Sequence, residues 1–199
     1  VTTVTLTSST AGATIYYTTD GSTPSTSSPS VPSGGTVVVD HTLTLKALGL
    51  TAGMAASDVV SGTYTLTLPI PTLSPGPGTY STPQTAACSS TVAGATLRYT
   101  TNGDLPTEAD PVCAGSVAIN QSTLLRVGAW KTGWTASTPT YSNYELKVGV
   151  QPFSPAGGSY GPGTSVTLTS QTPGAELHFS LDGHEPTVAD PWVASGGSV

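Results

Sequence analysis

Few side chains in this 199-residue sequence are of types that carry out chemistry. The most suggestive is Ser159, because the segment 157–161 fits the G-x-S-x-G pattern of a serine nucleophile. That nucleophile requires a strand, a sharp turn and then a helix, and no helical pattern follows Ser159. A matching segment earlier in the chain has Thr79 at the position of the serine. We therefore expect no catalytic residue and no enzyme activity.

Histidines and carboxylates are the other side chains that could hold a ligand. No two histidines have the four-residue spacing of a zinc-binding helix. Carboxylates gather near two turns, and calcium would need several such oxygens to converge. Aspartate, asparagine and serine are also ordinary turn residues, which requires no metal. We predict no metal and no cofactor, with calcium as the alternative. The residues concerned are His41, His178, His184, Asp104, Glu108, Asp110, Asp182, Glu185 and Asp190, and the matching first turn has Asp20, Ser22 and Ser28.

These residues lie on a repeated element. One turn recurs three times, roughly 80 residues apart, and each copy follows a short apolar strand. An Asp-Gly or Asn-Gly pair favours a tight turn, because glycine adopts positive φ without steric cost. Alternation along each strand predicts one buried and one exposed face. The turns are 20–25, 102–107 and 182–187; Tyr17, Tyr99 and Phe179 are predicted to be buried, and Tyr16, Arg98 and His178 exposed.

The composition favours an all-β protein outside the cell. Only 8% of the residues are charged, against about 25% in typical domains. Threonine and valine favour strands, while the 23 glycines and 17 prolines favour turns. Five basic residues and a net charge of −6 argue against a nucleic-acid partner. No segment approaches the roughly 20 apolar residues of a membrane span, so we expect no membrane insertion.

Aligning the copies divides the chain into three tandem immunoglobulin-like β-sandwich modules, of which the first and third are incomplete. The first, 1–68, lacks its first strand. The second, 69–149, is complete and begins with the segment 71–80, which we call its leading arm. The third, 150–199, is the first part of a module and begins with a similar leading arm, 151–160.

The repeated motifs resemble a known family. The series Ile-Tyr-Tyr-Thr-Thr-Asp-Gly-Ser-Thr-Pro-Ser at 15–25, Leu-Lys-Ala at 45–47, and then Gly53, Ser57 and Tyr64 are similar to the chitobiase/β-hexosaminidase C-terminal-like repeat, also described as the fibronectin type III-associated domain. The leading arm resembles the same family. The resemblance covers nearly the whole chain and implies immunoglobulin-like sandwiches found in bacterial glycoside hydrolases and large surface proteins. It implies no catalytic residues.

The two cysteines both belong to the second copy. Cys88 stands where the other copies have Leu6 and Leu168, and Cys113 stands where they have Val31 and Val193. Two core positions changed to cysteine together, which favours a disulfide over two small buried thiols. A disulfide would indicate an oxidising, extracellular or cell-surface location.

Aromatic and glycosylation motifs complete the candidate residues. Trp130 and Trp192 are candidates for exposure and carbohydrate contact, whereas Trp134 follows a glycine turn and is expected to pack in the core or at its rim. Asn120 begins an N-x-S acceptor pattern for glycosylation.

Two functions follow. The leading interpretation is a non-enzymatic structural protein whose repeats form a stalk, surface layer or fibre through end-to-end contacts. The alternative is an accessory, carbohydrate-associated region of a secreted bacterial glycoside hydrolase, with polysaccharide as a partner. A half sandwich exposes unpaired strand edges, so either more chain lies beyond both ends or neighbouring copies supply the missing strands. We expect self-association.

Overall fold

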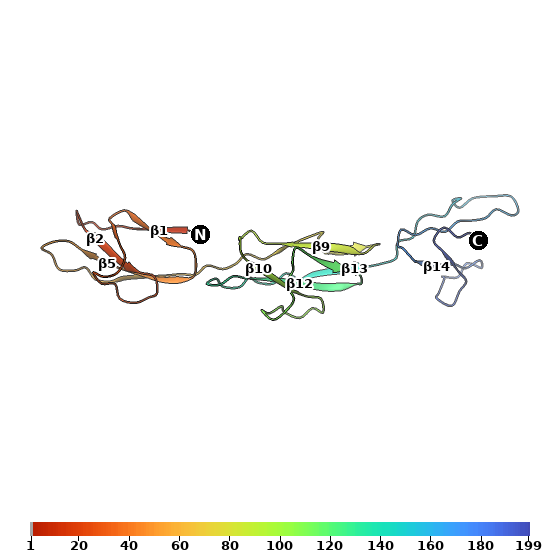
Figure 1. Ribbon diagram of the computed structural model, residues 1–199. Coiled ribbons are helices and arrows are strands. Elements are labelled where there is room, and N and C mark those ends of the chain that lie inside the picture. Colours follow the sequence, from red (N-terminus) through yellow and green to blue (C-terminus); the bar gives the residue numbers. More distant parts are fainter. Residues whose placement is uncertain (1) are drawn as a thin grey trace. The chain divides into compact units, whose positions relative to one another are not determined.

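A computed structural model describes residues 2–199, which form strands β1 to β15 and no helix in that range (Figure 1). The predicted all-β fold is therefore confirmed. No helix in the described range is long and apolar enough to cross a membrane. The chain divides into two compact units: unit 1 comprises Val1–Pro71, Ser90–Arg98 and Gly128–Pro139, and unit 2 comprises Thr72–Ser89, Tyr99–Val127 and Thr140–Val199. The predicted boundaries of the three modules stay predictions.

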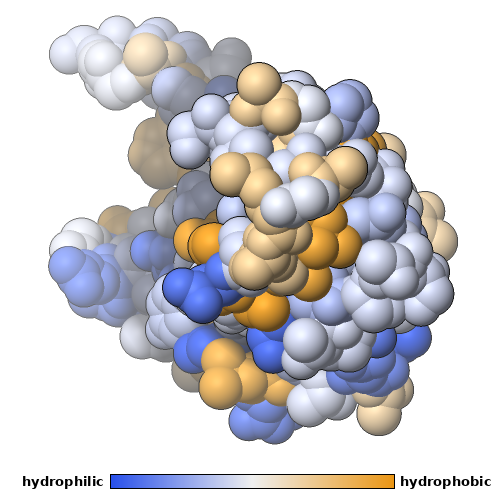
Figure 2. Space-filling view, turned by 90° about the vertical axis from the view of Figure 1, so that its left-hand side faces the viewer, coloured by the Kyte–Doolittle hydropathy of each residue, from blue (hydrophilic) through white to orange (hydrophobic). Residues whose placement is uncertain are grey.

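Unit 1 contains a two-stranded sheet, β1-β4, and a four-stranded antiparallel sheet in the order β3-β2-β5-β6. Val37, Val39, Leu43 and Leu45 form a buried cluster contributed by both sheets, as expected for a β-sandwich. Hydrophobic residues also reach the surface among hydrophilic ones on the side that carries β2 and β5 (Figure 2). The strands are β1 (Thr2–Leu6), β2 (Thr14–Thr18), β3 (Ser30–Pro32), β4 (Gly35–Val39), β5 (Leu43–Leu50) and β6 (Val60–Tyr64).

Unit 2 repeats this plan and adds the leading arm 71–80. One sheet has the order β11-β9-β7 and the other β10-β12-β13-β8, with residues of β10 and β12 belonging to both units. The leading arm supplies β7 to the first sheet and β8 to the second, where β8 pairs with β13 in parallel. The strands are β7 (Thr72–Ser74), β8 (Gly78–Tyr80), β9 (Gln84–Ser89), β10 (Thr96–Thr100), β11 (Ser116–Ile119), β12 (Thr123–Trp130), β13 (Ser142–Leu146), β14 (Glu176–His178) and β15 (Trp192–Ala194).

Two tyrosines fix the leading arm of the second copy. Tyr144 is fully buried, and its hydroxyl donates to the Pro75 carbonyl oxygen at 2.7 Å. The Tyr80 ring stacks on the Tyr144 ring with centroids 6.1 Å apart, and the Tyr80 hydroxyl donates to the Gly76 carbonyl oxygen. Burial raises the pKa of the Tyr144 hydroxyl. These contacts hold the leading arm across the edge of the sandwich.

The predicted contrast between the two strand faces is too sharp. Ile15, Leu97 and Leu177 are buried, as alternation requires. The aromatic residues expected in the core, Tyr17, Tyr99 and Phe179, are only half-buried, and so are Tyr16, Arg98 and His178 on the other face. The loop after the repeated turn explains part of this, because it returns alongside the strand: the Asp190 carbonyl oxygen lies 2.8 Å from His178 Nδ1.

Candidate functional site: the turn that joins two copies of the repeat

The segment after β12 forms a tight turn, Lys131–Thr135, which we call the tryptophan turn. The Trp134 amide donates to the Lys131 carbonyl oxygen at 3.0 Å, which closes the turn. Gly133 has a φ of +78°, a left-handed conformation that favours glycine. The turn therefore presents the Trp134 side chain at the end of the strand, at the rim where the sequence predicted it to pack.

Within unit 1, the tryptophan turn contacts the turn 40–42 of the first copy. The Trp134 indole N–H donates to the Asp40 carbonyl oxygen at 2.8 Å, and the Thr42 amide donates to the Gly133 carbonyl oxygen at 2.6 Å. A Cβ atom on Gly133 would lie 2.7 Å from the His41 Cβ. Glycine is thus required at position 133 both by its conformation and by the close approach of His41.

The same turn continues onto the segment 66–68 that follows β6. The Thr135 amide donates to the Leu66 carbonyl oxygen at 2.8 Å, and the Leu68 amide donates to the Thr135 carbonyl oxygen at 3.0 Å. These two bonds make a parallel bridge between Thr67 and Thr135. Leu68 is only 2% exposed. Four hydrogen bonds and a buried leucine therefore join the two copies at this junction.

Charges surround the indole. The Lys131 ammonium lies 5.1 Å from the centroid of the Trp134 ring, a cation–π distance, and donates to the Ala93 carbonyl oxygen. The Asp40 carboxylate bonds His41 Nδ1 at 2.5 Å. The pKa of Asp40 is lowered mainly by this bond to His41, with a smaller contribution from the positive charge of Lys131. The junction thus holds complementary charges at its surface.

The counterpart of the tryptophan turn in the first copy has no such contact in the described chain. The turn Thr51–Ala55 closes in the same way, with the Met54 amide 3.4 Å from the Thr51 carbonyl oxygen and a Gly53 φ of +79°. Met54, however, is 65% exposed, and no atom lies within 4 Å of a Cβ built on Gly53. The two turns share a backbone and differ in whether a neighbouring copy packs against them.

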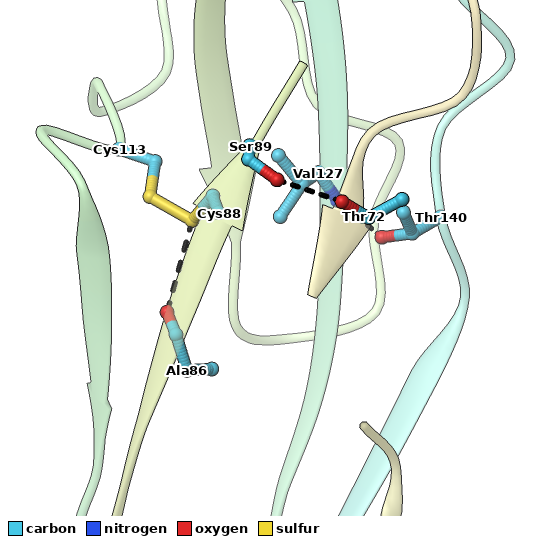
Figure 3. The surroundings of a disulfide bond; sticks show 7 residues. All are labelled: Thr72, Ala86, Cys88, Ser89, Cys113, Val127 and Thr140. Carbon is cyan, nitrogen blue, oxygen red and sulfur yellow. Dashed lines mark hydrogen bonds between the residues drawn. A yellow bond between two sulfur atoms is a disulfide. The ribbon is translucent and has the colours of Figure 1, made fainter. Parts of the chain in front are cut away.

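The predicted disulfide is confirmed. Cys88 on β9 is bonded to Cys113, with Cα atoms 6.5 Å apart, and both residues are buried (Figure 3). Cys88 Sγ lies 3.8 Å from the Ala86 carbonyl oxygen. Nearby, Thr72 Oγ1 bonds Ser89 Oγ at 2.7 Å, which ties β7 to β9. The disulfide therefore braces the sheet that carries the first part of the leading arm.

The candidate contact and glycosylation residues do not lie in one site. Trp192 on β15 is 51% exposed, whereas Trp130 at the end of β12 is half-buried. Asn120 is exposed and follows β11, so its side chain is accessible to solvent. Their roles in carbohydrate contact and glycosylation stay predictions.

The repeated turns use their polar residues as caps. The Ser22 amide donates to Asp20 Oδ1 at 2.9 Å, and the Asp104 amide donates to Asn102 Oδ1 at 3.1 Å. The Thr187 amide and hydroxyl both donate to Asp190 Oδ2. Among the described residues, no group of three or more histidines, cysteines or carboxylates is placed to hold a metal ion. The turn interpretation accounts for these carboxylates.

The third copy adds a histidine to its turn. His184 Nδ1 bonds the Asp182 carboxylate, and His184 Nε2 lies 3.0 Å from Asp190 Oδ1. The pKa of His184 is raised by the carboxylates of Asp190 and Asp182. The pKa of Asp190 falls to about 2, mainly because the Thr187 amide and hydroxyl bond it and also through His184. This cluster links the two ends of the turn.

Comparison with known proteins agrees with the repeat. The model of the chitobiase/beta-hexosaminidase C-terminal domain family matches residues 1–61, 75–142 and 155–192. The chain belongs to this family. The three matched segments correspond to the three copies of the chitobiase/beta-hexosaminidase C-terminal domain motif identified in the sequence. No curated protein matches the chain.

Proposed function

We propose that the chain is a non-catalytic, extracellular accessory region of a carbohydrate-active enzyme, in which joined copies of the repeat act as a spacer. The family is described as the C-terminal domain of chitobiase and beta-hexosaminidase, which favours an accessory role beside a hydrolase. The observation that carries the spacer role is the tryptophan turn, whose four hydrogen bonds join two copies in place of a free linker. The buried disulfide supports an oxidising location.

A second function, a structural stalk, surface layer or fibre made of repeats, is favoured by the repetition itself. The same junction would serve it, since a stiff array also needs joined copies. The two proposals differ in whether a catalytic domain belongs to the same protein.

The test joins the chain to the C-terminus of a β-hexosaminidase catalytic domain. The accessory proposal expects unchanged kcat/KM on a soluble chromogenic substrate and changed activity on insoluble chitin. Trp130→Ala and Trp192→Ala then show whether either indole contacts the polymer. Identical activity on both substrates with and without the chain would contradict the accessory role, and hydrolysis by the purified chain alone would contradict its non-catalytic nature.

A further inference from the structure

The first copy has a groove at an open sheet edge. A cavity of about 210 Å³ lies between the end of β1 and β6 in unit 1, and β6 is the last strand of its sheet. Val60, which lines it, is 70% exposed. An open edge of this kind offers unpaired backbone groups beside apolar side chains. The apolar lining residues are Leu6, Ile15, Leu45, Ala47, Val60 and Tyr64.

The second copy shows what such an edge accepts. Its strand β13 is the counterpart of β6 and pairs with β8 of the leading arm, so that Tyr144, Glu145 and Leu146 lie opposite Gly78, Thr79 and Tyr80. The Lys147 amide then donates to the Tyr80 carbonyl oxygen at 2.9 Å. The corresponding positions of the first copy are Tyr64, Thr65, Leu66 and Thr67.

The junction with the tryptophan turn leaves this edge free. Thr135 uses the Leu66 carbonyl oxygen and the Leu68 amide, which point to one side of the segment. Because backbone groups alternate along an extended chain, the amide and carbonyl of Thr67 point to the other side. The edge that would receive a leading arm is therefore distinct from the side that binds the tryptophan turn.

The leading arm of the third copy is exposed and already folded for pairing. Residues 156–165 are all exposed, and Tyr160 is 54% exposed. The Tyr160 hydroxyl donates to the Ala156 carbonyl oxygen at 2.6 Å, just as the Tyr80 hydroxyl donates to that of Gly76 at 2.7 Å. The segment thus keeps the internal bond of the paired leading arm, although no strand in the described chain pairs with 158–160. Such preorganisation lowers the cost of binding.

We propose that residues 156–161, in the leading arm of the third copy, add to the β6 edge of a second copy of this chain. Gly158, Ser159 and Tyr160 lie opposite Tyr64, Thr65 and Leu66, and the Tyr160 ring covers Tyr64 as Tyr80 covers Tyr144. The Thr67 amide donates to the Tyr160 carbonyl oxygen. This is strand addition, in which main-chain bonds supply affinity and a side-chain pocket supplies specificity. Because arm and groove differ, the contact runs head to tail and can continue from chain to chain. The inference does not rest on the proposed function.

Sedimentation equilibrium of the intact chain tests the contact. We expect association that depends on concentration below about 1 mM. Tyr160→Ala, at an exposed position, should weaken it at least about tenfold, as expected for a buried aromatic anchor. Thr67→Pro should weaken it too, because it removes the amide on the free edge. Tyr141→Ala, at another exposed tyrosine (66% exposed), is the matched control and should leave association unchanged.

Cross-linking locates the contact. Chains carrying Ser159→Cys are mixed with chains carrying Thr65→Cys and treated with a short bis-maleimide. A cross-linked heterodimer, with little product from either variant alone, is expected. A chain that stays monomeric up to about 1 mM would overturn the proposal. Association that survives Tyr160→Ala and yields no cross-link between positions 159 and 65 above the single-variant background would overturn it as well.

Discussion

At the scale of single residues, Trp134 carries the junction. It donates from its indole to a main-chain oxygen 94 residues away and lies under the Lys131 ammonium. Trp134→Ala should lower the free energy of unfolding by about 2 kcal/mol, since it loses a hydrogen bond and part of a packed ring. Trp134→Phe should lose about 1 kcal/mol, because it keeps the ring and removes the donor.

Urea denaturation followed by circular dichroism measures these changes. Met54→Ala is the matched control, because Met54 occupies the equivalent turn but is 65% exposed. It should change the free energy of unfolding by less than about 0.5 kcal/mol. Equal losses for Trp134→Ala and Met54→Ala would show that the tryptophan contact does not stabilise the fold.

His184 gives a second residue-scale prediction, through its pH dependence. Its pKa lies above the ordinary value of 6.5 because Asp190 and Asp182 favour the imidazolium. The stabilisation from His184 is therefore complete below pH 6.5 and is lost as the pH rises through the folded-state pKa. Asp190, with a pKa of about 2, contributes above pH 3.8 and loses its contribution as the pH falls towards 2.

NMR titration of the His184 ring protons measures this shift. Asp190→Asn should move the His184 pKa down towards 6.5, because the first and largest cause of the shift is removed. A wild-type value at or below 6.5, unchanged by the substitution, would refute the cluster.

At the scale of elements, the disulfide replaces an apolar contact that the other copies make. It spans 25 residues, a loop whose closure is worth roughly 3 kcal/mol. Cys88→Ala with Cys113→Ala should cost about that amount in the free energy of unfolding. Cys88→Leu with Cys113→Val, the residues of the other copies, should recover part of it through apolar burial. A double alanine variant as stable as the wild type in urea would show that the bond contributes nothing.

Elements also show what the sequence could and could not predict. Cysteines at equivalent core positions predicted the disulfide, and Asp-Gly and Asn-Gly pairs predicted the turns, because local chemistry decides both. Trp134 was predicted only to pack in the core or at its rim. Its partner is the Asp40 carbonyl oxygen, and a main-chain group has no signature in the sequence. The half-buried state of His178 was missed because a returning loop, not the strand pattern, covers it.

At the scale of the whole molecule, the repeat explains more than any single residue. Each copy offers the same turns and edges, so a contact made in one place has equivalents elsewhere that are free. Leu68 is 2% exposed where the tryptophan turn binds, while its counterpart Val148 is 52% exposed. The chain thus contains an internal control for its own junction.

Amide hydrogen exchange of the intact chain at low concentration tests the junction most directly. Thr42, Thr135 and Leu68 donate amide hydrogen bonds across the junction and should be protected. Their counterparts Ser122, Ala55 and Val148, for which the described chain shows no equivalent bond, should exchange much faster, and Trp134→Ala should remove the protection of the first three. Equal exchange rates for Leu68 and Val148 and for Thr42 and Ser122 would contradict the conclusion that the tryptophan turn joins the two copies.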